Sequence, residues 1–247
     1  MSIRLCAILA AFGIWWLLSL AMTSTVLPNP SETVTTLWAN IIGGAVWQDL
    51  LITLFRVIGG LALAMLIGVP IGVAMGLSKK AEKFLDTWVV IAMAVPSLCY
   101  ALVCFIVIGL NETATITAIA ITAAPTIAIN VWEGVKNIDT RLMSMARVFE
   151  TTLPRMFTKV VLPQILPYLV ASTRFGLGIV WKITVFIELI GRPNGVGFKL
   201  FYWYQLADMK QVLAWTLLFT IVMLVLEFAV LKPVEGRLFA WRPKVST

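Results

Sequence analysis

Long, uninterrupted apolar runs constrain this chain more than any other feature of its sequence. Each run is close to the roughly 20 residues that a helix needs to cross the hydrocarbon core of a bilayer. Apolar residues make up 60% of the chain and charged residues only 13%, whereas a soluble domain has about 25% charged residues. Because the runs are continuous rather than alternating, they indicate helices and not the strands of a barrel. The runs cover residues 3–22, 51–77, 88–110, 113–135, 168–191 and 212–231.

These runs predict an all-α integral membrane protein, a single transmembrane domain over residues 1–247 with six spanning helices. The first run has an alternative interpretation, because Arg4 precedes it and small residues follow Leu20 and Ala21, as in a signal peptide. Its apolar core is, however, longer than the roughly 7–15 residues of a signal peptide. We therefore expect a retained first spanning helix.

Basic residues lie mainly at the ends of the apolar runs. Because cytoplasmic loops carry an excess of Lys and Arg, this distribution places both termini in the cytoplasm. The net charge of +7 then reflects membrane topology and argues against a nucleic-acid partner. Only Arg192, Lys199 and Lys210 fall in segments assigned to the outside. The segments assigned to the inside carry Arg4, Lys79, Lys80, Lys83, Lys136, Arg141, Arg147, Arg155, Lys159, Lys232, Arg237, Arg242 and Lys244.

The residue types that carry most covalent chemistry are missing or isolated. The chain has no histidine, and Cys6, Cys99 and Cys104 lie inside apolar runs without a CxxC pair. This pattern argues against a zinc site, haem ligation by histidine and a histidine-based triad. The sequence also lacks the GxxxxGK[ST] loop that cradles nucleotide phosphates. We therefore expect no catalysis, no metal and no cofactor in this chain.

Regularly spaced glycines lie within the second apolar run. Gly68, Gly72 and Gly76 recur one helical turn apart, a spacing that lets another helix approach closely in lipid. We interpret them as packing positions.

The prolines leave two interpretations open. Pro96 and Ser97 interrupt the third run, and Pro125 and Asn130 lie inside the fourth. A proline in a spanning helix frees a carbonyl that must find another partner. Either these helices are simply kinked, or the kinked helices line a path across the membrane.

Five charged residues lie within or at the edge of the runs: Arg56, Arg174, Lys182, Glu188 and Glu227. Such groups are costly in hydrocarbon, so they usually pair or face a cavity. Arg56 and Arg174 both lie near span ends, within reach of the headgroups, and Arg56 is expected to extend toward them. Lys182 and Glu188 lie deeper in the fifth run, where we expect a structural role or a place on the path.

The segment between the fourth and fifth runs, residues 136–167, is basic and amphipathic. Its sequence predicts two short helices joined by a turn, with Pro154 in the first turn of the second helix. Pro163 and Pro167 are expected to end that helix and to start the next segment. Composition leaves open whether this segment rests on lipid headgroups or docks onto a partner.

This segment resembles the cytoplasmic loop of permease subunits of bacterial ATP-binding-cassette importers. That family's pattern is Glu-Ala-Ala, three residues, Gly, nine residues, Ile, one residue, Leu-Pro. The spacing is kept here, and Arg147 and Phe149 stand where sulfonate-type members carry Arg and Leu. The resemblance leaves open whether Glu150, at the Gly position, keeps the usual turn. The family's Glu, first Ala and Gly are replaced here by Ser144, Met145 and Glu150, and the other corresponding positions are Ala146, Val160, Leu162 and Pro163.

Two other stretches extend the resemblance to most of residues 50–240. Residues 53–78 are similar to the family's Thr-Leu-x-Arg start and Gly-rich second span. Residues 175–191 are similar to the segment after the loop, with Trp181 and Glu188 at matching places. The closest resemblance is to the taurine, alkanesulfonate and nitrate importers.

The resemblance implies a permease subunit in the bacterial cytoplasmic membrane. It implies two ATPase subunits that bind ATP and Mg, a second permease copy forming a homodimer, surrounding lipid, and a periplasmic or lipid-anchored binding protein. The expected ATPase-coupling residues are Ser144, Met145, Ala146, Arg147, Phe149, Glu150 and Thr151. The expected path residues are Ser97, Asn130, Arg174, Trp181, Lys182 and Glu188. The alternatives are a stand-alone secondary transporter or channel, and a membrane anchor without transport.

Overall fold

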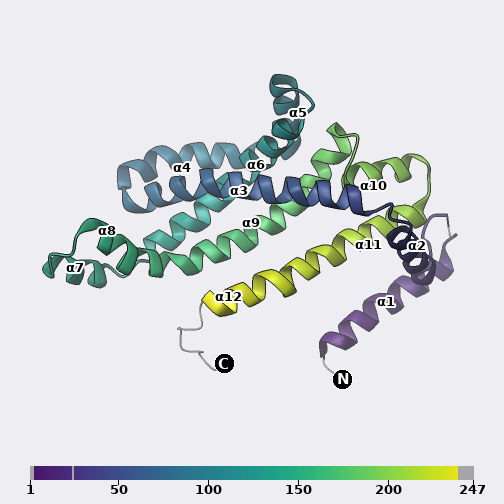
Figure 1. The fold of residues 1–247 in the computed structure, drawn as a ribbon, viewed down its shortest axis with the longest axis horizontal. Coiled ribbons are helices and arrows are strands. Elements are labelled where there is room, and N and C mark those ends of the chain that lie inside the picture. The colour runs from purple at the N-terminus through teal and green to yellow at the C-terminus, as the bar shows by residue number, and fades with distance from the viewer. Residues whose placement is uncertain (1–2, 24, 239–247) are drawn as a thin grey trace. The chain divides into compact units, whose positions relative to one another are not determined.

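A computed structural model describes residues 3–23 and 25–238 of the chain (Figure 1). Every regular element among these residues is a helix. In this part of the chain, four helices are long and apolar enough to cross a membrane. A fifth candidate span consists of two helices that meet at a bend of 92°. The predicted all-helical membrane protein is therefore confirmed, with four to five candidate spans in the described residues.

The chain divides into two compact units. The first unit joins the N-terminal residues up to Leu54 with the segment Val185–Leu226. Its helices are α1 (Ile3–Ala21), α2 (Pro30–Ile42), the start of α3 (Trp47–Leu77), the end of α9 (Leu162–Gly191), α10 (Val196–Gln205) and α11 (Met209–Val225).

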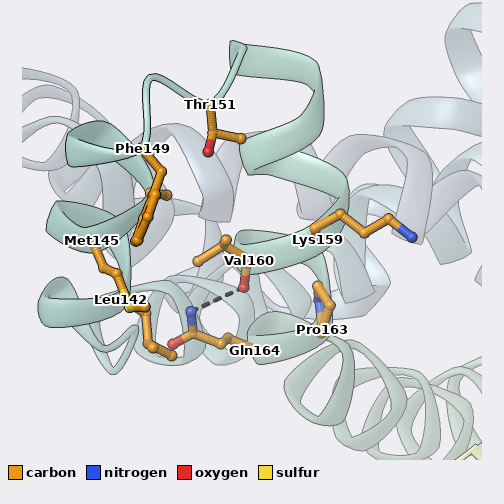
Figure 2. Close-up of a pocket in the computed structure, with 9 residues that line it drawn as sticks. Leu142, Met145, Phe149, Thr151, Lys159, Val160, Pro163 and Gln164 are labelled. Atoms are coloured by element: carbon orange, nitrogen blue, oxygen red, sulfur yellow. Dashed lines mark hydrogen bonds between the residues drawn. The ribbon is translucent and has the colours of Figure 1, made fainter.

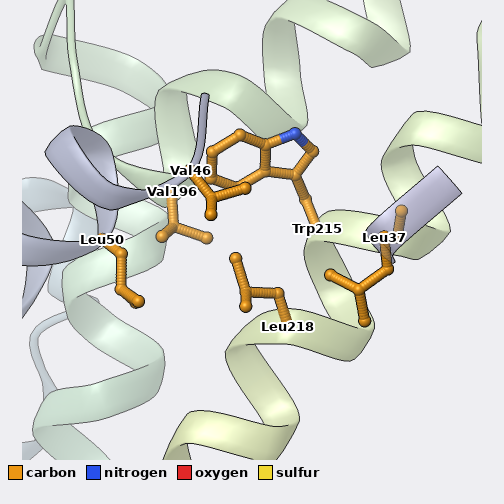
Figure 3. Close-up of a cluster of buried hydrophobic side chains, with 7 residues drawn as sticks. Leu37, Val46, Leu50, Val196, Trp215 and Leu218 are labelled. Carbon is orange, nitrogen blue, oxygen red and sulfur yellow. The ribbon is translucent and has the colours of Figure 1, made fainter. Parts of the chain in front are cut away.

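A small apolar core holds the first unit together (Figure 3). Trp215 and Leu218 of α11 are almost fully buried against residues of α2, α3 and α10. A polar contact adds to this packing, since Asn40 Nδ2 of α2 donates to Gln211 Oε1 of α11 over 2.7 Å. The buried members of this core are Leu37, Val46, Leu50, Val196, Ala214, Trp215 and Leu218.

The second unit comprises Phe55–Thr184 together with the chain from Glu227 onward. It contains most of α3 and α9 and two π-helical segments, η1 and η2. Its other elements are α4 (Lys79–Ala94), α5 (Ser97–Ile108), α6 (Glu112–Lys136), α7 (Thr140–Val148), α8 (Leu153–Met156), η1 (Phe157–Val161), η2 (Leu226–Leu231), which begins in the first unit, and α12 (Lys232–Leu238).

The glycines of α3 form the contact with α6, as their spacing predicts. A Cβ added at Gly72 would lie 2.4 Å from the carbonyl oxygen of Ala128, and one at Gly68 would lie 2.6 Å from that of Ala124. At Gly76 the added atom would lie 2.4 Å from the side chain of Val135. The two backbones are thus close enough to exclude any side chain along three turns of α3.

The third apolar run, predicted as one interrupted span over residues 88–110, is divided between α4 and α5. Val95 and Pro96 are extended, with ψ of 125° and 138°, and separate the two helices. Proline disfavours helical geometry in the residue before it, which explains why the break falls at Val95. The break is sharper than a kink, and the two helices diverge in Figure 1.

The expectation that Pro163 and Pro167 break the chain is wrong, because residues Pro154–Gly191 form one continuous 38-residue helix. The π-helical segment η1 lies directly before Pro163, and the Leu162 amide donates to the Phe157 carbonyl, five residues back. This wider turn changes the hydrogen-bond pattern where Pro163 supplies no N–H. Gln164 Nε2 also donates to the Val160 carbonyl over 2.9 Å.

The glycine contact yields a prediction for the variant Gly72→Ala. Because the added Cβ would meet a backbone oxygen of α6, we expect a loss of about 1–3 kcal/mol in the free energy of unfolding, typical of overpacking. The measurement is the thermal unfolding midpoint of the protein in detergent. Gly178→Ala is the matched control, since a Cβ there meets nothing within 4 Å. Equal midpoints for the two variants would contradict the close contact.

Candidate functional site

The loop between α6 and α9 is fastened at both ends by one side chain, that of Gln164. Its Oε1 accepts from the Asp139 amide over 2.8 Å, while its Nε2 donates to the Val160 carbonyl. Asp139 Oδ1 in turn accepts from the Arg141 amide over 2.8 Å at the start of α7. Gln164 therefore joins the beginning of the loop to the helix that returns from it.

A left-handed residue ends α7. Glu150 has a φ of 50°, and beyond it the Thr151 amide donates to the Ala146 carbonyl over 3.0 Å. This five-residue closure is typical of a helix C-terminus at which glycine is usual. The turn that the sequence left open is thus formed here with glutamate in the strained position.

An apolar groove of about 490 Å³ lies between α7 and the returning helix (Figure 2). We call it the loop groove. Phe149 is 71% exposed and Met145 55% exposed, whereas Ala146 is buried at 8%. Large apolar side chains are thus exposed beside a buried small one, as on surfaces that contact lipid or another protein. The lining residues are Leu142, Met145, Ala146, Phe149, Thr151, Lys159, Val160, Pro163 and Gln164.

The structure brings together four of the predicted coupling residues, Met145, Ala146, Phe149 and Thr151, in this groove. Ser144 is exposed and lies outside the lining, and Glu150 supplies the turn instead. The side chain of Arg147 lies outside the described residues. Sequence reasoning missed Gln164 as a member of the site. Its only signal is an amide side chain between two prolines in an otherwise apolar and basic segment.

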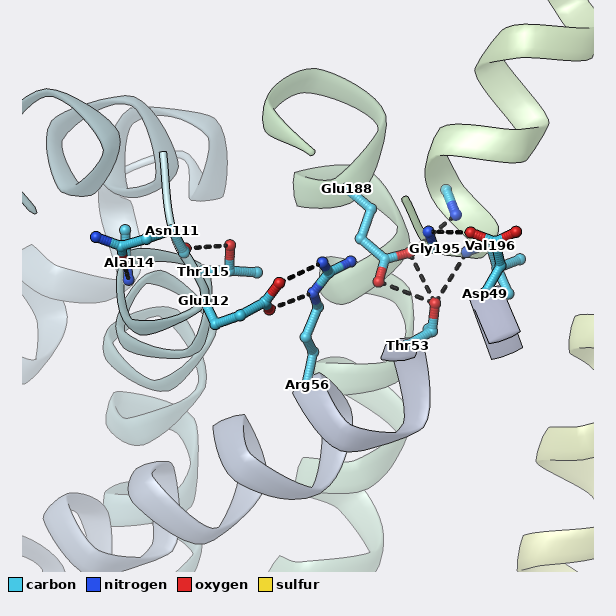
Figure 4. Close-up of polar contacts among 11 residues, drawn as sticks. Asp49, Thr53, Arg56, Asn111, Glu112, Ala114, Thr115, Glu188, Gly195 and Val196 are labelled. Carbon is cyan, nitrogen blue, oxygen red and sulfur yellow. Dashed lines mark hydrogen bonds and ion pairs between the residues drawn. The ribbon is translucent and has the colours of Figure 1, made fainter. Parts of the chain in front are cut away.

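Arg56 does not extend toward headgroups, so that prediction is wrong. Its side chain is fully buried, with Nε 2.7 Å from Glu112 Oε2 and Nη2 2.8 Å from Glu112 Oε1 (Figure 4). Glu112 is the first residue of α6, where a carboxylate also interacts favourably with the helix dipole. A two-point arginine–carboxylate pair is strong and directional, and it joins α3 to the start of α6.

The other charges of the spans fall into different environments. Arg174 forms ion pairs with Glu227 and, over 3.4 Å, with Glu235, so α9 is joined to η2 and α12. Lys182 is exposed, and the neighbouring Trp181 is buried at 4%. A path role for these three predicted residues stays a prediction.

Glu188 is fully buried within the first unit (Figure 4). Its two carboxylate oxygens each lie 2.9 Å from Thr53 Oγ1, and Oε2 also accepts from the Gly197 amide over 2.9 Å. Asp49 Oδ1 accepts from the Gly195 amide over 2.7 Å, and Gly195 has a φ of 105°. These contacts fasten the loop between α9 and α10 to the start of α3, which favours a structural role for Glu188.

Ser97 lines a second cavity, of about 340 Å³, together with residues of α6 and α9. Asn130, the other predicted path residue with a short polar side chain, is not among its lining residues, and its Nδ2 donates to the Thr126 carbonyl over 2.8 Å. Thr122 and Thr126 also line the cavity, and sequence reasoning missed both of them. No group of metal-ligating side chains occurs within the described part of the chain.

These features define a multi-pass helical membrane protein with a structured amphipathic loop, and comparison with known proteins agrees. Residues 65–231 match the family described as "Binding-protein-dependent transport system inner membrane component". The chain belongs to this family of ABC transporter permeases.

Two relatives cover most of the chain. The putative aliphatic sulfonates transport permease protein SsuC of Bacillus subtilis is 31% identical over 221 residues, which is 90% of this chain and 80% of the relative. The taurine transport system permease protein TauC of Escherichia coli is 29% identical over 240 residues, covering 94% and 87% respectively.

A solved structure confirms the fold alone. An inward-facing structure of the MetNI methionine ABC transporter aligns with a TM-score of 0.69 at 21% identity, covering 77% of this chain and 94% of that chain.

The strained turn at Glu150 yields a prediction. A non-glycine residue in the left-handed region costs about 1–2 kcal/mol, so Glu150→Gly should slow hydrogen exchange of the Thr151 amide roughly fivefold or more. Glu150→Val should accelerate it, because a β-branched residue fits this conformation poorly. Ala207→Gly is the matched control. Ala207 also has a positive φ, of 56°, but it lies in the connection between α10 and α11. The strained turn at Glu150 would be contradicted if Ala207→Gly changed hydrogen exchange of the Thr151 amide, or if Glu150→Gly left it unchanged.

Proposed function

We propose that this permease forms the solute path of an ATP-binding-cassette importer in which two separate ATPase subunits bind ATP and Mg. A second copy of this chain completes the path as a homodimer. A binding protein delivers the solute from outside. Family membership supports the importer, and the observation that carries the coupling role is the loop groove with its exposed Phe149.

In this proposal α7 is the coupling helix and lies against an ATPase subunit as a helix in a groove. Ala146 is buried within the loop and keeps α7 close to the returning helix, and the exposed Phe149 supplies the large apolar anchor for the ATPase. Movement of the ATPase subunits reaches α9 through Gln164, because this side chain joins the start of the loop to the returning helix. ATP-driven closure would thus be transmitted as movement of packed helices.

For topology we propose six spans with both termini in the cytoplasm. The apolar helix Leu9–Ala21 and the α4–α5 pair then count as spans beside the four long helices. The lysines at the start of α4 support a cytoplasmic position for that end, and Lys136 at the end of α6 pairs with Glu82 over 3.1 Å. The loop groove follows directly after α6 and falls on the same side.

For the substrate we propose a small sulfonate or a related anion, on the basis of the relatives SsuC and TauC. Arg174 is partly neutralised by two carboxylates. Lys182 is then the better candidate of the two for contact with an anion in the path. The alternative of a stand-alone secondary transporter predicts uptake into vesicles without the ATPase subunits, whereas the importer requires them.

The loop groove yields a prediction for Phe149→Ala. Truncating an apolar anchor of an interface commonly costs about 2 kcal/mol or more, which corresponds to a roughly 30-fold weaker ATPase association. Ala146→Glu should have a similar effect, because a charged and larger side chain at this position, which is already buried within the loop, would displace α7 and the exposed Phe149 on it. The measurements are ATPase copurification and transport-coupled ATP hydrolysis.

Val148→Ala is the matched control, since Val148 is 80% exposed on the same helix and is not among the residues that line the groove. It should retain the ATPase subunits. Full copurification of both Phe149→Ala and Ala146→Glu would mean that the loop rests on lipid, and the coupling role would be lost.

The topology yields its own prediction. In a cysteine-free background, Asn111→Cys and Asn194→Cys should react with an impermeant thiol reagent in intact cells. Lys80→Cys should react only after the membrane is permeabilised, since the lysines at this end of α4 are expected inside. Reaction of position 80 in intact cells would overturn the six-span arrangement.

A further inference from the structure

The cavity that contains Ser97 lies at the break between α4 and α5, and we call it the helix-break cavity. Its volume is about 340 Å³. Three parts of the second unit contribute, namely the α4–α5 break, α6 and α9. The lining residues are Ala92, Met93, Ala94, Val95, Pro96, Ser97, Thr122, Thr126, Ile179 and Ile183.

The position along the helices places this cavity deep in the membrane. Thr122 and Thr126 lie near the middle of α6, which runs from Glu112 to Lys136. Ile183 lies on α9, which is likewise a candidate span. Lining residues from the middle of a spanning helix put the cavity about half-way through the hydrocarbon layer.

The backbone at the break requires polar partners. The last turn of α4 leaves carbonyls without helical partners, and Pro96 has no N–H to offer. Two of the carbonyls near the break accept hydrogen bonds from nearby residues. Tyr100 Oη donates to the Ala92 carbonyl and the Cys99 amide donates to the Pro96 carbonyl, each over 2.9 Å. Non-helical backbone at membrane depth is tolerated only where protein buries it or where it lines a water-filled cavity.

The side chains of the cavity supply neutral hydrogen-bonding groups. Thr122 Oγ1 donates to the Ala118 carbonyl over 2.7 Å and keeps its capacity to accept. Among the described residues, no hydrogen-bond partner is found for the hydroxyls of Ser97 and Thr126. The lining residues carry no charged side chain, and Ile179 and Ile183 provide an apolar wall.

We propose that the helix-break cavity is a water-filled solute site on the translocation path, which recognises one small polar headgroup through hydroxyls, whereas Lys182, which does not line the cavity, contacts the anion elsewhere on the path. This rests on the importer function proposed above. A volume of about 340 Å³ lies at the lower end of ligand pockets, roughly 300–1,000 Å³, and suits a small solute. The hydroxyls of Ser97 and Thr126 donate to the oxygens of a sulfonate-type headgroup, and the isoleucines contact its aliphatic part.

Recognition without a charge also suits conduction. A site in a path must bind strongly enough to admit the solute and weakly enough to release it. Neutral hydrogen bonds contribute about 0.5–1.5 kcal/mol each, less than those to charged groups. A binding protein provides the affinity outside, so the cavity needs only to favour passage.

The first test measures water access. In a cysteine-free background, Thr126→Cys and Thr122→Cys are assembled with the ATPase subunits and treated with a small charged methanethiosulfonate. Ile121→Cys is the matched control, because Ile121 neighbours Thr122 on α6 at the same depth but lines an adjoining cavity whose lining residues are all apolar. We expect reaction at positions 122 and 126 at least tenfold faster than at 121. Equal rates at all three positions would overturn the proposal.

The second test measures recognition with taurine and methanesulfonate as probes, in vesicles that contain the full complex. Ser97→Ala combined with Thr126→Val should lower the uptake rate about tenfold, as expected for the loss of two neutral hydrogen bonds. Thr117→Val is the control, since Thr117 lies on α6 but does not line the cavity. Retained ATPase copurification shows that the variants are assembled.

The outcomes separate the two proposals. Wild-type complex without ATP-dependent uptake of either probe would overturn the sulfonate importer, while the labelling rates still decide whether the cavity holds water. Wild-type uptake that Ser97→Ala with Thr126→Val leaves unchanged would overturn the solute site and leave the importer standing.

Discussion

Close contact between α3 and α6 is the constraint on which the second unit depends. In lipid, helices gain little from apolar burial against one another, so association relies on tight packing and on polar contacts. Gly68 and Gly72 bring the backbone of α3 against carbonyls of α6, and one turn further on Gly76 lies against the side chain of Val135. The pair of Arg56 and Glu112 then joins the same two helices at one end. With α6 fixed in this way, Thr122 and Thr126 are presented toward the break between α4 and α5.

Much of the architecture could be predicted from the sequence because its causes are local. Apolar run length indicates spanning helices, glycine spacing indicates a packing face, and Pro96 marks the end of a helix. The partner of Arg56 could not be predicted, since Glu112 lies 56 residues away and only the packing of α3 on α6 brings the two together. For Pro163 and Pro167 the prediction failed because it relied on local preference alone. Their local preference for a break is overridden by a π-helical turn that the sequence does not reveal.

In the candidate site, too, residues with a local signal could be predicted and residues that depend on tertiary packing could not. Met145, Ala146 and Phe149 could be identified because a family pattern and helical spacing place them on one short helix. Gln164 could not, since its importance comes from joining residues 25 positions apart. Thr122 and Thr126 carry no sequence signal either, because threonine in a spanning helix usually bonds to its own backbone. Thr122 does so, and its membership of a cavity depends on which helix lies opposite.

The fastening around Glu188 has a consequence for how the protein is made. The contacts of Glu188 with Thr53 and of Asp49 with the Gly195 amide join positions 135 and 146 residues apart. A chain emerging from the ribosome presents Asp49 and Thr53 long before their partners exist. The first unit can therefore close only after the end of α9 has been synthesised and inserted. Until then the Asp49 carboxylate and the Thr53 hydroxyl at the start of α3 must stay hydrated. Completion of this unit is therefore a late step in the synthesis of the chain.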